Sequence, residues 1–199
     1  MRSNVCKIDK GTKDLEAILK ESEKVAVYNE LTHKQMLKLR LLCEEIDGML
    51  PNIIEDFEGE LYIECVDKVC SINISLSVPE LNSEKRAELI NVANNKQNAS
   101  AVGIVGKIRN AIESFLLSED AKSVFTVCSD SFYLSTGYVN ESAYSHLWTL
   151  DKYRKAVNKD EMAESYDELE RSVIASVADD VTVGVKGNRA EIIITKNFN

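Results

Sequence analysis

The chain has 199 residues, of which 44% are hydrophobic and 29% charged, which suits one well-packed domain spanning residues 1–199. Its formal net charge of -9 at pH 7 would repel a phosphate backbone, which argues against a nucleic-acid-binding protein. No stretch approaches the roughly 18 apolar residues of a membrane span, and the N-terminus lacks the apolar run of a secretory signal, so we expect a cytoplasmic protein with no membrane partner.

Two helices are predicted in the first quarter of the chain. Residues 14–28 have helical composition and an acid at their start, which suits the positive end of a helix dipole. Thr32 and Gln35 have the spacing of a capping box, which begins a second helix. We expect that helix to end near Leu50, because Pro51 cannot continue it. Its apolar residues recur at steps of three and four and form one stripe: Leu39, Leu42, Cys43, Ile46, Met49 and Leu50.

Residues 60–78 change to a period of two and predict a hairpin with its turn at Asp67 and Lys68. Pairing Val66 with Val69 brings all the apolar residues to one face. The pairs that follow are Cys65 with Cys70, Ile63 with Ile72 and Leu61 with Ile74.

The five cysteines are scattered and include no CxxC pair, so we expect reduced, buried thiols rather than a disulfide framework. A regulatory disulfide between the cross-strand neighbours Cys65 and Cys70 is the alternative. His33 and His146 lie far apart in the sequence, and we predict no metal.

The middle of the chain is less regular. Ser83 can cap a short helix, and a polar loop follows from Asn94 to Ser100. A helix is predicted from Gly103 to Leu117. Residues 118–160 form an elaboration with a predicted strand at 124–128 and a Trp/Tyr segment in which Leu147, Leu150 and Tyr153 have helical spacing.

The C-terminal region predicts an acidic amphipathic helix at 161–178 and a hairpin at 181–194, with Gly187 and Asn188 in the turn. Two one-sided hairpins and several one-sided helices are best buried against each other. We therefore predict an α+β fold, a two-layer sandwich with a mostly antiparallel or mixed sheet and helices on one face.

Glu44 and Glu45 stand side by side inside the apolar pattern of the second helix. At about 100° per residue, one of them should lie at the edge of the apolar stripe. A carboxylate beside an apolar pocket has a raised pKa and can serve as a general base. The edge of an ordinary surface helix is the alternative reading.

Gly103, Gly106 and Lys107 begin the helix at 103–117. Free backbone N–H groups, the helix dipole and a nearby cation suit a phosphate, and Asn94 belongs to the polar loop that would accompany them. Close packing at a helix start explains the same glycines equally well.

Taken in chain order, these features resemble the GHKL ATPase superfamily, in particular its anti-sigma-factor serine kinase branch. "LRLLCEEIDGML" resembles the N-box helix, "GIVGKIRNAIE" the second glycine box, and "VTVGVKGNRAEIIITKNF" the terminal hairpin. The resemblance implies ATP or ADP with Mg²⁺, with Glu44 or Glu45 as the base. It also implies phosphate contacts from Gly103, Gly106, Lys107 and the loop at Asn94, and it suggests a homodimer.

The chain departs from that family at two motifs. Four residues after the two glutamates stand Gly48 and Met49 in place of the Mg²⁺-binding asparagine, and "VPELNSEKR" lacks the adenine-reading Asp-x-Gly-x-Gly. We therefore expect a regulatory or protein-binding module with a protein partner and weak or absent ATP binding. An active ATP-dependent serine kinase is the first alternative. A docking face made by residues 161–178 and the Trp148 segment, without any nucleotide, is the second.

Overall fold

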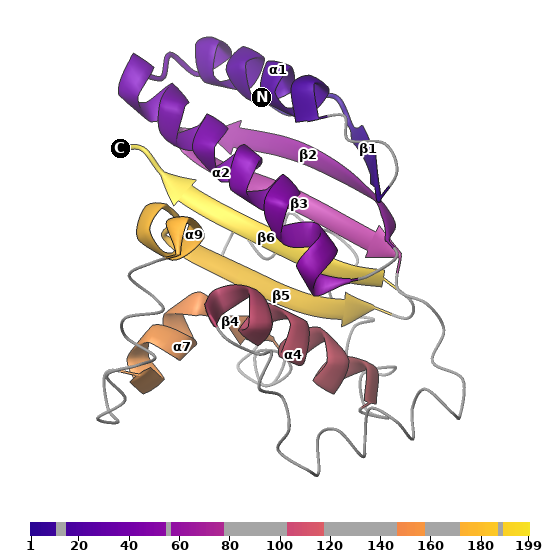
Figure 1. Cartoon of the computed structure of the whole chain (residues 1–199). Helices are drawn as coiled ribbons and strands as arrows, with labels where there is room; N and C mark the ends of the chain where they lie inside the picture. Colours follow the sequence, from indigo (N-terminus) through magenta and orange to yellow (C-terminus); the bar gives the residue numbers. More distant parts are fainter. Residues whose placement is uncertain (11–14, 55–56, 78–102, 118–146, 158–171, 187–188) are drawn as a thin grey trace.

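The computed structural model describes residues 1–10, 15–54, 57–77, 103–117, 147–157, 172–186 and 189–199 (Figure 1). The described part is an α+β structure with a six-stranded sheet in the order β1-β2-β3-β6-β5-β4, and every neighbouring pair of strands is antiparallel. The strands are β1 (Cys6–Asp9), β2 (Glu58–Val66), β3 (Val69–Ser77), β4 (Trp148–Thr149), β5 (Asp180–Lys186) and β6 (Arg189–Asn197). The helices are α1 (Leu15–Tyr28), α2 (His33–Ile53), α4 (Gly103–Leu117), α7 (Leu150–Val157) and α9 (Val173–Val177).

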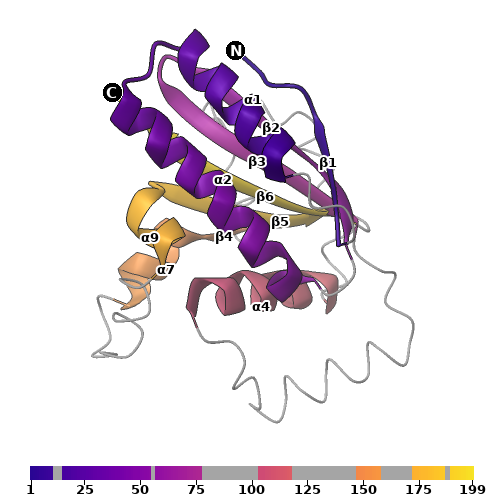
Figure 2. The same cartoon turned by 45° about the horizontal axis from the view of Figure 1, so that its top comes forward.

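Helices α1, α2 and α4 lie side by side over one face of the sheet, with α2 in the middle (Figures 1 and 2). The core lies between these helices and the inward side chains of the strands. Among its fully buried members are Leu39, Leu42 and Ile46 of α2, Ile63 of β2, Ile72 of β3, Ile192 of β6 and Ile108 of α4. The predicted arrangement of an antiparallel sheet with helices on one face is confirmed for the described residues.

Both predicted hairpins have the expected register. In the first, Cys65 lies opposite Cys70 and Leu61 opposite Ile74, as the alternating pattern requires. The turn residues Asp67 and Lys68 have φ values of 49° and 59°, the left-handed region that a two-residue hairpin turn with the right twist demands. In the second hairpin, Val183 lies opposite Ile192.

The capping box at the start of α2 is confirmed. The Thr32 side chain accepts from the backbone N–H of Gln35, and the Gln35 side chain accepts from the backbone N–H of Thr32. Gln35 also donates from Nε2 to the carbonyl of Phe198 at 2.6 Å. The cap therefore joins the start of α2 to the end of the chain, a contact that the local pattern did not predict.

The predicted end of α2 at Leu50 is wrong. The helix continues through Pro51 to Ile53, and the Ile54 N–H closes the last turn on the carbonyl of Leu50. Proline removes one intrahelical hydrogen bond but has a helical φ. Burial of Ile53 in the core offsets that loss and keeps the last turn in place.

The expectation of reduced thiols is also wrong for one pair. Cys65 and Cys70 form a disulfide across β2 and β3, with their Cα atoms 4.0 Å apart. The register that aligns the apolar face also brings these two side chains together. Cys6 and Cys43 are free and buried, and burial raises the pKa of Cys43 to about 12, so its thiol stays protonated. Cys128 lies outside the described residues.

Two edge strands were missed by the sequence patterns. Strand β1 pairs with β2, and its four residues are too few to show a period. Strand β4 takes Trp148 and Thr149 from the segment expected to be helical, so α7 begins only at Leu150 and Leu147 lies before it. The predicted helix after Ser83, the strand at 124–128 and most of the acidic helix at 161–178 lie outside the described residues.

Glu21 ties α1 to the N-terminal segment. It is buried and accepts hydrogen bonds from the backbone N–H and side-chain amide of Asn4 and from Lys24. The bond from Lys24 holds the pKa of Glu21 below its ordinary value of 4.5; burial opposes this effect and the Asn4 bonds add to it. Because the folded pKa is the lower one, the stabilisation is present above pH 4.5 and is lost as the pH falls through the folded pKa.

We expect Glu21→Gln to lower the free energy of unfolding by about 1 kcal/mol near neutral pH, since Lys24 is half exposed and its bond is screened. The variant should also lose less stability than the wild type on acidification below pH 4.5. Urea unfolding of both proteins at neutral and acidic pH measures this difference. Identical pH dependence in the two proteins would contradict the assignment.

Candidate functional site

The two helices expected to form the nucleotide site are neighbours. α2 and α4 contact each other on the same side of the sheet, and the C-terminal end of α2 lies next to α4 (Figures 1 and 2). The structure thus brings together the elements that carry the paired glutamates and the paired glycines, about sixty positions apart in the chain.

Glu44 faces away from the core. It is exposed and its carboxylate accepts from Arg40 Nε at 3.1 Å, while the same guanidinium binds Glu23 of α1. The bond that Arg40 donates to Glu44 foremost, and the one to Glu23, raise the pKa of Arg40. Glu44 therefore belongs to an exposed surface network that links α1 to α2, and solvent screens its ion pairs.

Glu45 lies at the edge of the apolar stripe, as predicted for one of the two acids, and is half-buried. Glu45 follows Arg40 by five positions, about 140° around the helix, so it points to the flank of α2 away from the one that faces α1. Continuation of the helix through Pro51 adds a second polar residue there. Asn52 follows Glu45 by seven residues, about two turns, and therefore shares its flank.

The glycines at the start of α4 have different roles. Gly103 has a φ of 76°, which a residue with a side chain rarely adopts, so glycine is needed for the chain to enter the helix. Gly106 is buried one turn later. Burial of Gly106 agrees with the packing explanation, whereas Gly103 is explained by its backbone conformation, since a Cβ there would meet no atom within 4 Å.

Lys107 is half-buried and points towards α7, where its ammonium lies 5.7 Å from the centroid of the Tyr153 ring. This cation–π contact joins α4 to α7. It occupies the ammonium group that was expected to bind a phosphate. Asn94, the fourth candidate for the phosphate site, lies outside the described residues. In the described ranges, no group of three or more His, Cys, Asp or Glu side chains could hold a metal ion.

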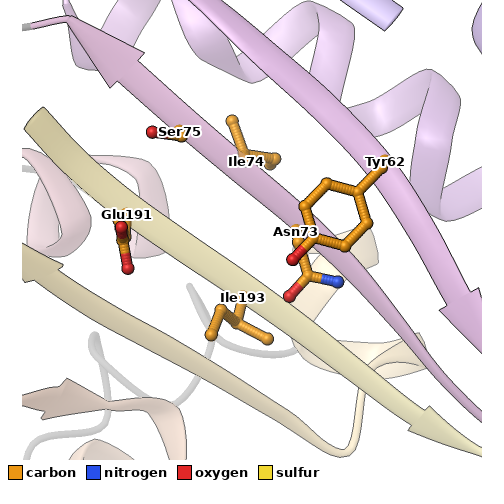
Figure 3. A pocket seen from close by; sticks show the side chains of 6 residues that line it. All are labelled: Tyr62, Asn73, Ile74, Ser75, Glu191 and Ile193. Atoms are coloured by element: carbon orange, nitrogen blue, oxygen red, sulfur yellow. The ribbon is translucent and has the colours of Figure 1, made fainter. Parts of the chain in front are cut away.

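A second site lies on the face of the sheet opposite α1, α2 and α4, which we call the second face. Side chains of three neighbouring strands surround a hollow of about 60 Å³ there (Figure 3). Strand pairing aligns them in two rows: Tyr62, Asn73 and Ile193 form one, and Glu60, Ser75 and Glu191 form the next. The residues that line this sheet-face hollow are Tyr62, Asn73, Ile74, Ser75, Glu191 and Ile193.

The sheet-face hollow was missed because a period of two predicts the buried face of a strand from its apolar positions only. The outward positions of β3 read as serines around one asparagine, which a solvated face explains equally well. Ile193 is a signal in the sequence that could have indicated it. An isoleucine at an outward position of β6 breaks the alternation and marks a place where the second face is not simply solvated.

None of the described helices is both long and apolar enough to cross a membrane. Comparison with protein-family models found no match, and comparisons with curated proteins and with solved structures also found none. The residues and their geometry are therefore the basis on which a function can be proposed.

Proposed function

We propose that the chain is a regulatory, protein-binding module with a GHKL-like order of elements and weak or absent ATP binding. The observation that carries the proposal is the position of Glu44, which points away from the core and is bound by Arg40. A general base must face its substrate and hold no competing cation. A carboxylate engaged in this way stabilises the contact between α1 and α2 instead.

The start of α4 supports the same conclusion. A phosphate site at a helix N-terminus uses free N–H groups and an available cation. Here Lys107 lies over Tyr153, and Gly106 is packed in the interior. In addition, the Mg²⁺-binding asparagine and the adenine motif are missing from their expected places in the sequence. Phosphoryl transfer depends on such a metal ligand, so efficient turnover is not expected.

Titration calorimetry with ATP and ADP, with and without Mg²⁺, tests the proposal. We expect no binding at micromolar affinity under either condition, because both the metal ligand and the adenine contact are missing. A micromolar dissociation constant for either nucleotide would refute it. Denaturation of the protein before titration provides the baseline for heat of dilution and nonspecific binding.

An active ATP-dependent serine kinase is the second candidate, and one observation favours it. Glu45 and Asn52 share the flank of α2 that faces away from α1, which restores an acid and an amide to one side of this helix. The amide of Asn52 donates to the carbonyl of Gly48, which leaves its oxygen for another partner.

The two glutamates separate this candidate from the first. If the chain hydrolyses ATP, Glu45→Gln should abolish phosphate release by removing the base, whereas Glu44→Gln should leave it unchanged. Phosphate release by wild type and both variants is the measurement. Loss of activity in Glu44→Gln but not in Glu45→Gln would exclude this assignment of roles.

A further inference from the structure

The sheet-face hollow holds polar groups without partners. Asn73 is only 9% exposed, and its amide nitrogen donates to the Ser71 hydroxyl at 3.0 Å, which leaves the amide oxygen for the hollow. Within the described part of the chain, that oxygen, the Tyr62 hydroxyl and the Glu191 carboxylate take part in no hydrogen bond or ion pair. No fully buried side-chain nitrogen or oxygen of the described residues lacks a hydrogen-bond partner, so these three groups are still reached by solvent. A ligand that supplies donors would take the place of water there.

The size and shape of the hollow restrict that ligand. A volume of about 60 Å³ is far below the roughly 300–1,000 Å³ of pockets that hold small molecules such as nucleotides. It suits the end of one side chain. The ring face of Tyr62 is also taken, because the Arg2 guanidinium lies 3.7 Å from its centroid. The ring therefore offers its hydroxyl edge rather than a platform on which a sugar or base could stack.

The charge of the hollow favours a cation. Glu60 and Glu191 flank Ser75 in one row, roughly 10 Å apart across two strand spacings. Neither is paired within the described residues. Lys7 of β1 lies opposite Glu60 in the same row, whereas the neighbours of Glu191 across the strands, Ser75 and Gly184, carry no charge, so Glu191 supplies the negative charge of the lining. Arg2 lies over Tyr62, and Arg189 lies one row further along β6. The net charge of -9 on the whole chain adds a long-range attraction for a basic partner.

We propose that the sheet-face hollow binds a lysine side chain of a basic segment in a partner protein. The ammonium has three donors and no acceptor, which match the Asn73 amide oxygen, the Tyr62 hydroxyl and the Glu191 carboxylate. Ile193 provides the apolar contact for the methylenes of the same side chain. This inference rests on the proposed function as a protein-binding module and names the chemistry of its partner.

The test uses the full chain, labelled with ¹⁵N, and a ten-residue peptide with three lysines separated by glycine and serine. In an NMR titration we expect shifts at the Asn73 side-chain amide and at the backbone amides of Tyr62, Ser75 and Glu191. The same peptide with acetylated lysines should cause none, because acetylation removes the charge and two donors. Added salt should weaken binding of the charged peptide.

Glu191→Gln should lower the affinity for the lysine peptide about tenfold, because it removes a charge-assisted hydrogen bond and keeps the shape of the side chain. Tyr62→Phe should lower the affinity severalfold, because it removes the hydroxyl. This variant keeps the aromatic ring beneath Arg2. The matched control is Glu16→Gln, which changes the net charge equally at an exposed position of α1. We expect its affinity to stay within about twofold of the wild type. Thermal unfolding confirms that each variant is folded.

Four results would overturn the inference: equal binding of the acetylated peptide, equal weakening by Glu16→Gln and Glu191→Gln, shifts confined to α1 and α2, or binding of spermine without binding of the peptide. The last would assign the hollow to a free polyamine. If the peptide does not bind and ATP does not bind either, the inference about lysine is refuted and the proposed function is not. Micromolar ATP binding refutes the proposed function whether or not the peptide binds.

Discussion

Replacing Ile192 with alanine should lower the free energy of unfolding by about 2–5 kcal/mol, the range for a large aliphatic side chain removed from a packed interior. Ile192 is fully buried at the centre of the sheet, between Ile74 of β3 and Val183 of β5. Its side chain faces the helical layer, where both neighbouring strands are fixed by backbone pairing. The surrounding structure therefore has little freedom to close the cavity.

Ile193→Ala is the matched control, because the two positions are adjacent but face opposite sides of the sheet. Ile193 is half-buried at the sheet-face hollow, so its truncation should cost less than about 1.5 kcal/mol. Urea unfolding of the two variants and the wild type measures both values. Equal destabilisation would mean that the second face is packed as tightly as the first, and would contradict the two-layer description.

Gly59→Ala should lower the free energy of unfolding by about 2–3 kcal/mol, at the upper end for overpacking. A Cβ at this position would lie 2.3 Å from the backbone carbonyl oxygen of Ser75 and 2.9 Å from Leu76 Cδ2. The first of these atoms belongs to the backbone of β3 and cannot rotate away. The clash can be relieved only if β2 moves away from β3, and at this position β2 is also paired with Ile8 of β1.

Gly48→Ala should have the opposite effect and raise the free energy of unfolding by about 0.5–1 kcal/mol. Gly48 lies inside α2 and is exposed, and a Cβ added there would meet no atom within 4 Å. The new methyl group therefore restricts the unfolded chain without a clash. Thermal and urea unfolding of the two glycine variants should give shifts of opposite sign. Stabilisation by Gly59→Ala would show that β2 and β3 are not paired as described.

The resemblance to GHKL proteins came from the order of elements along the sequence. The helix with the paired acids, the first hairpin, the glycine-led helix and the last hairpin all lie where the patterns put them. The directions in which the candidate side chains point did not follow from that order. Glu44 is directed outward by the packing of its own helix, and Lys107 lies over Tyr153, a residue of another helix that the pattern around Lys107 does not include.

Several features of the fold followed from the amino-acid sequence alone, because their causes are local. Alternation predicted the registers of β2 with β3 and of β5 with β6, since a shift of one residue would turn every apolar side chain outward. The side chains of Thr32 and Gln35 lie within one turn of each other and could be recognised as a cap. The bounds of α4, Gly103–Leu117, came from the same kind of short-range pattern.

Tertiary structure alone decided the rest, because the contacts join distant parts of the chain. Burial of Ile53 carries α2 past Pro51, and pairing with a hairpin about fifty residues away turns the short segment Cys6–Asp9 into a strand. The sheet-face hollow is the clearest case. Asn73 and Ile193 are 120 positions apart, and only the antiparallel alignment of β3 with β6 puts them beside each other. Local periodicity fixes which side of a strand a residue faces, whereas its neighbours there depend on which strands pair.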